Sequence, residues 1–157
     1  MRHSIRENFT DPDCNINAQG VDLIYEKMRE VIKYIPCMNK IKIISSPYKR
    51  TRQTASEVGH ILGIEHMHIA NILHEIDGEE DEQSRIRCAN ILELMKKSNY
   101  DSIIVTHGGV MNVILKLLNP RHTYVKHTHP SLYVPRYTDF IVLDFINNKW
   151  NLVHKSF

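Results

Sequence analysis

Apolar residues recur at helical spacing in four segments of this chain. Positions three and four apart lie on one face of a helix, so this spacing predicts amphipathic helices. The predicted helices span residues 20–35, 48–62, 82–97 and 108–118. The second is opened by Ser45-Ser46-Pro47 and stopped by Gly63, which are typical boundary residues.

Short runs rich in β-branched residues alternate with these helices. The runs IKIIS (41–45), MHIANIL (67–73) and SIIVT (102–106) predict strands, whereas residues 4–19 are polar and predict a loop. Near the C-terminus, FIVLDFI and KWNLVHK flank Asn147-Asn148, which predicts an antiparallel hairpin. The alternation predicts an α/β fold: a three-layer sandwich with a mostly parallel central sheet, flanking helices and a C-terminal hairpin.

Composition and charge narrow the class of protein. The chain has 157 residues, 42% of them hydrophobic, which suits one domain over residues 1–157. The 20 basic residues are balanced by 18 acidic ones, so we do not expect the excess of positive charge that attracts nucleic acid. No apolar run reaches the ~20 residues that a membrane span needs, and the polar N-terminal residues do not resemble a secretory signal. Three widely spaced cysteines favour reduced thiols, and hence a cytoplasmic location.

Chemically capable residues follow three of the predicted strands. Arg50 comes soon after the strand predicted at 41–45, Glu75 follows the run at 67–73, and His107 directly follows SIIVT. In α/β sheets, ligands bind beyond the carboxyl ends of the strands. These residues are therefore the first candidates for a functional site.

Two of these segments, together with the N-terminus, suit an anionic ligand. Arg50 lies in the first turn of a predicted helix, where phosphate is favoured and an arginine adds a bidentate donor. His107 is followed by Gly108-Gly109, and glycines let a ligand approach the backbone closely. Arg2-His3-Ser4-Ile5-Arg6 places two guanidiniums around an imidazole. Taken singly, each segment also fits a solvated terminus, a capped helix with surface arginines, or a structural histidine.

The order of these segments resembles that of the histidine phosphatase superfamily, the phosphoglycerate-mutase-like group. The resemblance rests on Arg2-His3, the pattern SSPxxRxxQTA from Ser45 to Ala55, a strand-end glutamate and a strand leading into His107-Gly108-Gly109, and it covers almost the whole chain. Arg6, three positions past His3, is similar to the RHxxR variant of the acid-phosphatase and protein-tyrosine-phosphatase-like branches.

The resemblance implies a role for each matching residue. His3 would be the nucleophile that accepts the phosphoryl group, and Glu75 the proton donor to the leaving group. The phosphate oxygens would be held by Arg2, Arg6, Arg50 and His107. Because arginines can supply the positive charge, the resemblance implies neither a metal nor another cofactor. Further carboxyl groups that could replace Glu75 follow it closely in the sequence: Asp77, Glu79, Glu80 and Asp81.

Two features depart from the family pattern. Only Met1 precedes Arg2-His3, where the family has an apolar strand. Either the native reading frame begins upstream or the strand is missing, and we expect a frayed terminus to hold Arg2 and His3 poorly. Ser4 stands where the family favours glycine, and we expect it to alter how closely the backbone approaches phosphate.

Other mechanisms fit less well. A cysteine phosphatase needs an arginine six residues after its cysteine, whereas Cys14, Cys37 and Cys88 are followed there by Gly20, Ile43 and Leu94. Asp11-Pro12-Asp13 lacks the preceding apolar strand of an aspartyl-phosphate enzyme. The histidines at 66, 68, 122, 127 and 129 have no carboxylates or cysteine pairs at metal-ligand spacing and fit solvated loops.

The sequence therefore predicts a phosphomonoester hydrolase that forms a phosphohistidine and acts on a phosphorylated small molecule or a phosphoprotein. An impaired phosphate-binding or interaction module on the same fold is the alternative from another class. A phosphoglycerate-type mutase is a third. Arg121, His122, Lys126 and Arg136 precede the last strands, where they either meet a second acidic group or form a solvated loop.

Overall fold

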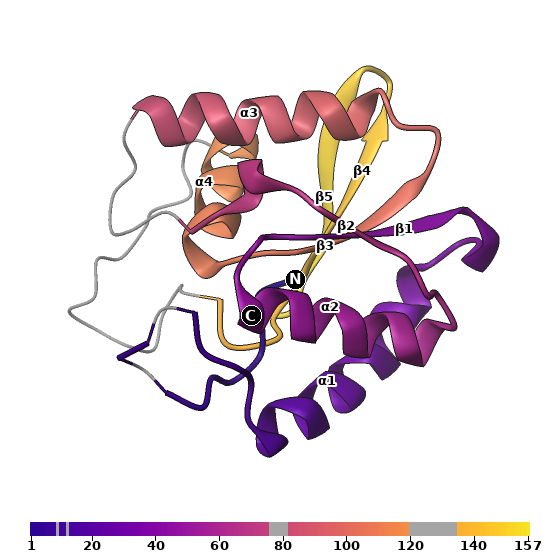
Figure 1. Cartoon of the computed structure of the whole chain (residues 1–157). Helices are drawn as coiled ribbons and strands as arrows, with labels where there is room; N and C mark the ends of the chain where they lie inside the picture. The colour runs from indigo at the N-terminus through magenta and orange to yellow at the C-terminus, as the bar shows by residue number, and fades with distance from the viewer. Residues whose placement is uncertain (9, 12, 76–81, 120–134) are drawn as a thin grey trace.

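The computed structural model describes residues 1–8, 10–11, 13–75, 82–119 and 135–157 (Figure 1). The helices of the described residues are α1 (Ala18–Val31), α2 (Lys49–Leu62), α3 (Glu82–Lys96) and α4 (Gly108–Leu118). Their strands are β1 (Ile41–Ser45), β2 (Met67–Ile69), β3 (Asp101–Val105), β4 (Ile141–Ile146) and β5 (Lys149–Lys155). Three short 3₁₀ turns complete the described elements: η1 (Ile32–Tyr34), η2 (Met38–Lys40) and η3 (Asn71–Leu73).

A parallel sheet of order β2-β1-β3 forms the middle layer, with Ile43 of β1 opposite Met67 on one side and Ile103 on the other. Helices α1 and α2 cover one face, and α3 and α4 cover the other (Figure 1). Each face has its own apolar core. The first includes Ile24, Met28 and Val58, and the second includes Cys88, Ile91 and Val110. The predicted three-layer α/β fold is confirmed.

The C-terminal hairpin is also confirmed. Strands β4 and β5 pair antiparallel in a separate two-stranded sheet. Asn147 and Asn148 both take positive φ, at 53° and 60°, as a tight hairpin turn requires. Two cavities of about 560 and 380 Å³ separate β4 from β3, and Met1 lines both.

Two predicted elements are shorter in the structure. The helix predicted to run to Ile35 ends at Val31 and continues only as η1. The strand predicted over 67–73 stops at Ile69, because Ala70 donates its N–H to the Ser45 carbonyl and the chain then turns through η3. Leu73 lies after the strand but is buried in the second core, which explains why the apolar run is longer than β2.

The N-terminal residues do not fray. Met1 and His3 pair with the end of β3: the Thr106 N–H donates to the Met1 carbonyl, and the His3 N–H donates to the Thr106 carbonyl, both at 2.9 Å. On the other side, the Arg2 N–H donates to the Asp139 carbonyl at 2.8 Å. The expectation that Arg2 and His3 would be poorly held is therefore wrong, since backbone hydrogen bonds on both sides fix them.

Candidate active site

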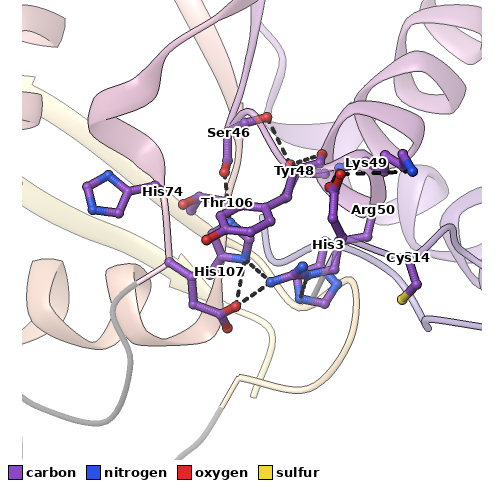
Figure 2. A network of polar contacts seen from close by, with 12 residues as sticks. His3, Cys14, Ser46, Tyr48, Lys49, Arg50, His74, Thr106 and His107 are labelled. Carbon is purple, nitrogen blue, oxygen red and sulfur yellow. Dashed lines mark hydrogen bonds and ion pairs between the residues drawn. The ribbon is translucent and has the colours of Figure 1, made fainter. Parts of the chain in front are cut away.

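The candidate residues meet at the carboxyl ends of the strands. His3 follows the segment that pairs with β3, Arg50 lies in the first turn of α2, Glu75 follows η3, and His107 caps α4. Figure 2 shows His3, Arg50 and His107 converging, with Tyr48 and Thr106 beside them. The strand-end rule selected Arg50, Glu75 and His107 from the sequence, and the structure brings these three together, because parallel strands bring their ends to one edge of the sheet. His3, which only the family resemblance indicated, lies beside them.

His3 is fully enclosed and held in one tautomer. Its side chain is 2% exposed, and its Nδ1–H donates to the Ser4 carbonyl at 2.8 Å. A carbonyl can only accept, so Nδ1 carries the proton and Nε2 carries the lone pair. That lone pair accepts a hydrogen bond from Arg50 Nε at 3.1 Å. Nε2 is the nitrogen that faces the arginine.

Arg50 joins the other groups of the site. Its guanidinium has no exposed surface, yet it contacts both histidines and a carboxylate. Besides the bond to His3, Nη2 donates to His107 Nδ1 at 3.2 Å and forms an ion pair with Glu75 Oε2. A buried guanidinium needs such partners, since an unpaired buried charge is costly.

His107 is held in the opposite tautomer. Its Nδ1 accepts from Arg50, so Nε2 carries the proton, and that nitrogen lies 2.8 Å from Ser46 Oγ. Sequence reasoning named Ser46 only as a strand-end residue and missed this contact. Nothing in the local pattern indicates it, because the two residues are 61 positions apart.

Both histidines are neutral near pH 7. Burial lowers the pKa of His3 to about 3, and the charges of Arg2, Arg50 and Arg6 oppose its protonation further. Burial lowers the pKa of His107 to about 2, with His3 and Arg50 as the next causes. A neutral imidazole with a free electron pair is the form that can act as a nucleophile.

Glu75 reaches the same cluster from a different loop. Its side chain is 31% exposed, and Oε2 lies 3.9 Å from His107 Nδ1. Thr106 fixes the approach of this loop, since its hydroxyl donates to the Leu73 carbonyl at 3.0 Å. Thr106 thus ties together the chain before Glu75, the backbone of His3 and the end of β3.

Arg2 presents a buried donor that is unpaired among the described residues. Its Nη1 donates to the Pro135 carbonyl, while Nε is buried and has no hydrogen-bond partner in the part of the chain that the structure describes. Burial lowers the pKa of Arg2. A Cβ added to Gly108 would lie 3.6 Å from Arg2 Cδ and Nε, so Arg2 packs on the first residue of α4. A buried N–H without an acceptor costs about 1–3 kcal/mol, which a bound oxyanion would offset.

Arg6 lies further along the same segment. Its backbone forms an isolated antiparallel bridge with Ile16, and its charge is among those that lower the pKa of His3. It is therefore within electrostatic reach of His3.

Ser4 replaces the expected glycine without backbone strain. Among the described residues, only Gly63, Thr138, Asn147 and Asn148 take positive φ, so position 4 does not need glycine. Ser4 Oγ donates to the Gly20 carbonyl at 2.6 Å, and its N–H donates to Thr54 Oγ1 at 3.0 Å. Its hydroxyl ties the His3 segment to α1, and the effect of Ser4 on how closely the backbone approaches phosphate stays a prediction.

The remaining part of the SSPxxRxxQTA pattern has a structural explanation. Gln53 Oε1 accepts from the Ile16 N–H at 2.8 Å, and Thr54 Oγ1 donates to the Arg50 carbonyl at 2.7 Å. Gln53 and Thr54 therefore lock α2 to the N-terminal segment and keep Arg50 beside His3.

Two tyrosines that sequence reasoning did not single out also line the site. The Arg50 guanidinium carbon lies 4.6 Å from the Tyr48 ring centre, and the Arg2 guanidinium carbon lies 4.5 Å from that of Tyr137. Each tyrosine also contacts a histidine: Tyr48 meets His107 edge-on at 5.2 Å, and Tyr137 meets His3 at 5.7 Å.

In the hydrogen bonds of the described residues, the cysteines do not join this cluster. Burial raises the pKa of Cys88 to about 11, which keeps its thiol protonated, and Cys14 Sγ donates to the Asn8 carbonyl at 2.9 Å. Some earlier candidates lie outside the described residues: Asp77, Glu79, Glu80, Asp81, Arg121, His122, Lys126, His127 and His129.

No protein-family model and no curated protein sequence matches this chain. Solved structures do match it. A phosphoserine phosphatase from Entamoeba histolytica has a TM-score of 0.71 at 16% identity, over 98% of this chain and 93% of its own. The protein histidine phosphatase SixA, complexed with tungstate, has a TM-score of 0.65 at 15% identity, and the match covers 99% of this chain and 92% of SixA. A mycobacterial glucosyl-3-phosphoglycerate phosphatase has a TM-score of 0.67 at 16% identity, and the match covers 96% of this chain and 94% of that phosphatase.

These neighbours are histidine phosphatases, and this chain has their fold. The resemblance predicted from the sequence is therefore confirmed at the level of the fold. Throughout the described ranges, no helix is both long and apolar enough to span a membrane.

Proposed function

We propose that this protein hydrolyses phosphomonoesters through a phosphohistidine on His3. One observation carries the proposal: the neutral His3 offers its Nε2 electron pair 3.1 Å from Arg50 Nε, at the centre of a group that includes His107, Arg2 and Glu75. The solved neighbours are phosphatases whose described substrates or ligands are phosphorylated compounds or tungstate, which supports the same chemistry here.

In the first step, His3 Nε2 attacks phosphorus and the bond from phosphorus to the leaving oxygen breaks. Arg50, Arg2, Arg6 and His107 stabilise the charge on the phosphoryl oxygens, so no metal or other cofactor is required. Glu75 donates a proton to the leaving oxygen, which departs as an alcohol. Its partly exposed side chain can then exchange protons with solvent.

In the second step, water attacks the phosphorus of phosphohistidine. Glu75 accepts a proton from the water, the nitrogen–phosphorus bond breaks, and His3 returns to its neutral form. The cluster of cations that binds the first phosphoryl group also holds inorganic phosphate until it leaves. The substrate class is a phosphorylated small molecule or a phosphoprotein.

The binding-module alternative rested on the missing strand before Arg2-His3 and on Ser4. The hydrogen bonds from this segment to Thr106, Asp139 and Thr54 support the enzyme instead. We therefore give priority to the enzyme.

Hydrolysis of phosphoserine, phosphotyrosine and p-nitrophenyl phosphate tests the proposal, with His3→Asn as the control for contaminating phosphatase. We expect phosphate release that EDTA does not change and that the variant lacks. Tight vanadate binding with no turnover of any ester would favour the binding module, and loss of activity on chelation would indicate a metal mechanism.

A further inference from the structure

The segment 135–139 hydrogen-bonds to Arg2 and His3 on the side opposite β3. The Asp139 carbonyl accepts from the Arg2 N–H at 2.8 Å, the Pro135 carbonyl accepts from Arg2 Nη1, and the Thr138 N–H donates to the His3 carbonyl at 3.4 Å. These contacts reach the backbone of Arg2 and His3 and the side chain of Arg2, so this segment helps to hold both residues in place.

The backbone of this segment takes an unusual course to make these contacts. Thr138 is fully buried and has a φ of 60°, which is uncommon for a β-branched residue. Asp139 holds the turn, since its carboxylate accepts from the Arg136 N–H and from Ser156 Oγ. Strained backbone that the surroundings hold in place is typical of functional sites.

This turn places the Tyr137 ring against two residues of the site, Arg2 and His3. Its ring centre lies 4.5 Å from the Arg2 guanidinium carbon and 5.7 Å from the centre of the His3 ring. Gly108 packs against the aliphatic end and Nε of Arg2. With Nη1 bonded to the Pro135 carbonyl, the guanidinium keeps a buried Nε–H that has no hydrogen-bond partner among the described residues.

We propose that Tyr137 is a positioning residue that holds the Arg2 guanidinium by its aromatic face, so that Arg2 Nε–H is ready to bind a phosphoryl oxygen beside His3. This inference rests on the proposed function for its catalytic consequence, but oxyanion binding tests it independently. An aromatic face attracts a guanidinium through its quadrupole, which an aliphatic side chain of similar size lacks.

The experiment compares Tyr137→Leu with Tyr137→Phe, and uses Tyr25→Leu on the exposed surface of α1 as the matched control. Vanadate affinity is measured by calorimetry, and kcat and KM are measured on p-nitrophenyl phosphate. We expect Tyr137→Leu to weaken vanadate binding roughly fivefold, and Tyr137→Phe to restore it because the phenyl ring keeps the cation–π contact. Tyr25→Leu should bind like the unaltered protein.

A double-mutant cycle shows whether Tyr137 acts through Arg2. In an Arg2→Ala background, Tyr137→Leu should change vanadate affinity by no more than about twofold, because the group it positions is gone. Equal affinity in the Leu and Phe variants, or an undiminished effect without Arg2, would overturn the inference while leaving the hydrolysis intact. Tyr137-dependent vanadate binding in a protein that hydrolyses no ester would instead refute the proposed function alone.

Discussion

His3 and His107 share one arginine but are oriented by different means. Their rings meet edge-on with centres 5.4 Å apart, and each accepts a hydrogen bond from Arg50. His3 is oriented by the carbonyl of its own chain neighbour, Ser4. His107 is oriented by the hydroxyl of Ser46, which comes from a different strand end.

This difference separates a ring held by the backbone from a ring held by a side chain. A backbone carbonyl cannot be removed by a side-chain change and can only accept, so His3 always presents the Nε2 electron pair. The Arg50 guanidinium can only donate, so His107 accepts at Nδ1 and donates its Nε2–H to Ser46 Oγ. The orientation of His107 therefore depends on the Ser46 side chain, whereas the Ser4 carbonyl orients His3 whatever side chain stands at position 4.

Glu75 lies on the His107 side of this pair, and its removal gives the largest expected effect. Glu75→Gln should slow hydrolysis of phosphoserine by roughly 10²–10⁴-fold, because an alkoxide leaves poorly without a proton. Hydrolysis of p-nitrophenyl phosphate should fall much less, because the aryl oxide leaves as an anion. The check is kcat/KM on both substrates, with Glu26→Gln on α1 as the control. Equal losses on both would mean that Glu75 only holds Arg50.

The protonation of the two histidines should make stability depend on pH. Unfolded histidine titrates near 6.5, whereas burial lowers the pKa of His3 to about 3 and that of His107 to about 2. Between these values the unfolded state binds more protons, so the free energy of unfolding falls as pH drops below 6.5. At pH 5 the loss is on the order of 2 kcal/mol for each histidine.

Urea unfolding at pH 7 and pH 5 measures this loss. We expect His3→Asn to reduce the pH dependence by about half, because one of the two groups is gone. His60→Gln, at an exposed position of α2, should leave it unchanged. The same pH dependence in His3→Asn and in the unaltered protein would mean that His3 does not stay neutral when folded.

The smallest expected effect on activity, that of Ser46→Ala, is the most direct test of how His3 and His107 differ. Ser46→Ala removes the side chain that orients His107, and we expect kcat/KM to fall roughly fivefold, as for one lost hydrogen bond. Nitrogen NMR of the imidazoles should show a changed environment of the His107 Nε2–H but the same tautomer for both histidines, because Arg50 still donates to each ring. Ser45→Ala is the matched control, since its hydroxyl donates to a backbone carbonyl. A tautomer change at either histidine, or an unchanged His107 Nε2–H, would contradict the way in which the two rings are held.

Local pattern predicted the elements that position the site. The strands 41–45 and 102–106 and the helix starts at Arg50 and Gly108 follow from apolar runs and their boundary residues, and the parallel topology brings their ends together. The strand predicted over 67–73 was too long, because burial of Leu73 extends the apolar run without extending β2.

Contacts between distant residues could not be predicted in this way. Tyr137 meets Arg2 and Ser46 meets His107 only after folding, and neither pair has a characteristic spacing. The stability of the N-terminus was misjudged for the same reason. Its partners are Thr106 and Asp139, and no nearby residue indicates them.

Trapping the phosphorylated intermediate tests the central claim most directly. The protein is mixed briefly with a ³²P-labelled phosphomonoester, quenched in base and digested, and the labelled peptide is identified. We expect label on His3 Nε2, stable in alkali and labile in acid, and absent from His3→Asn along with turnover. Label on His107 or on a residue outside the site, or full hydrolysis by His3→Asn, would contradict the assignment of His3 as the nucleophile.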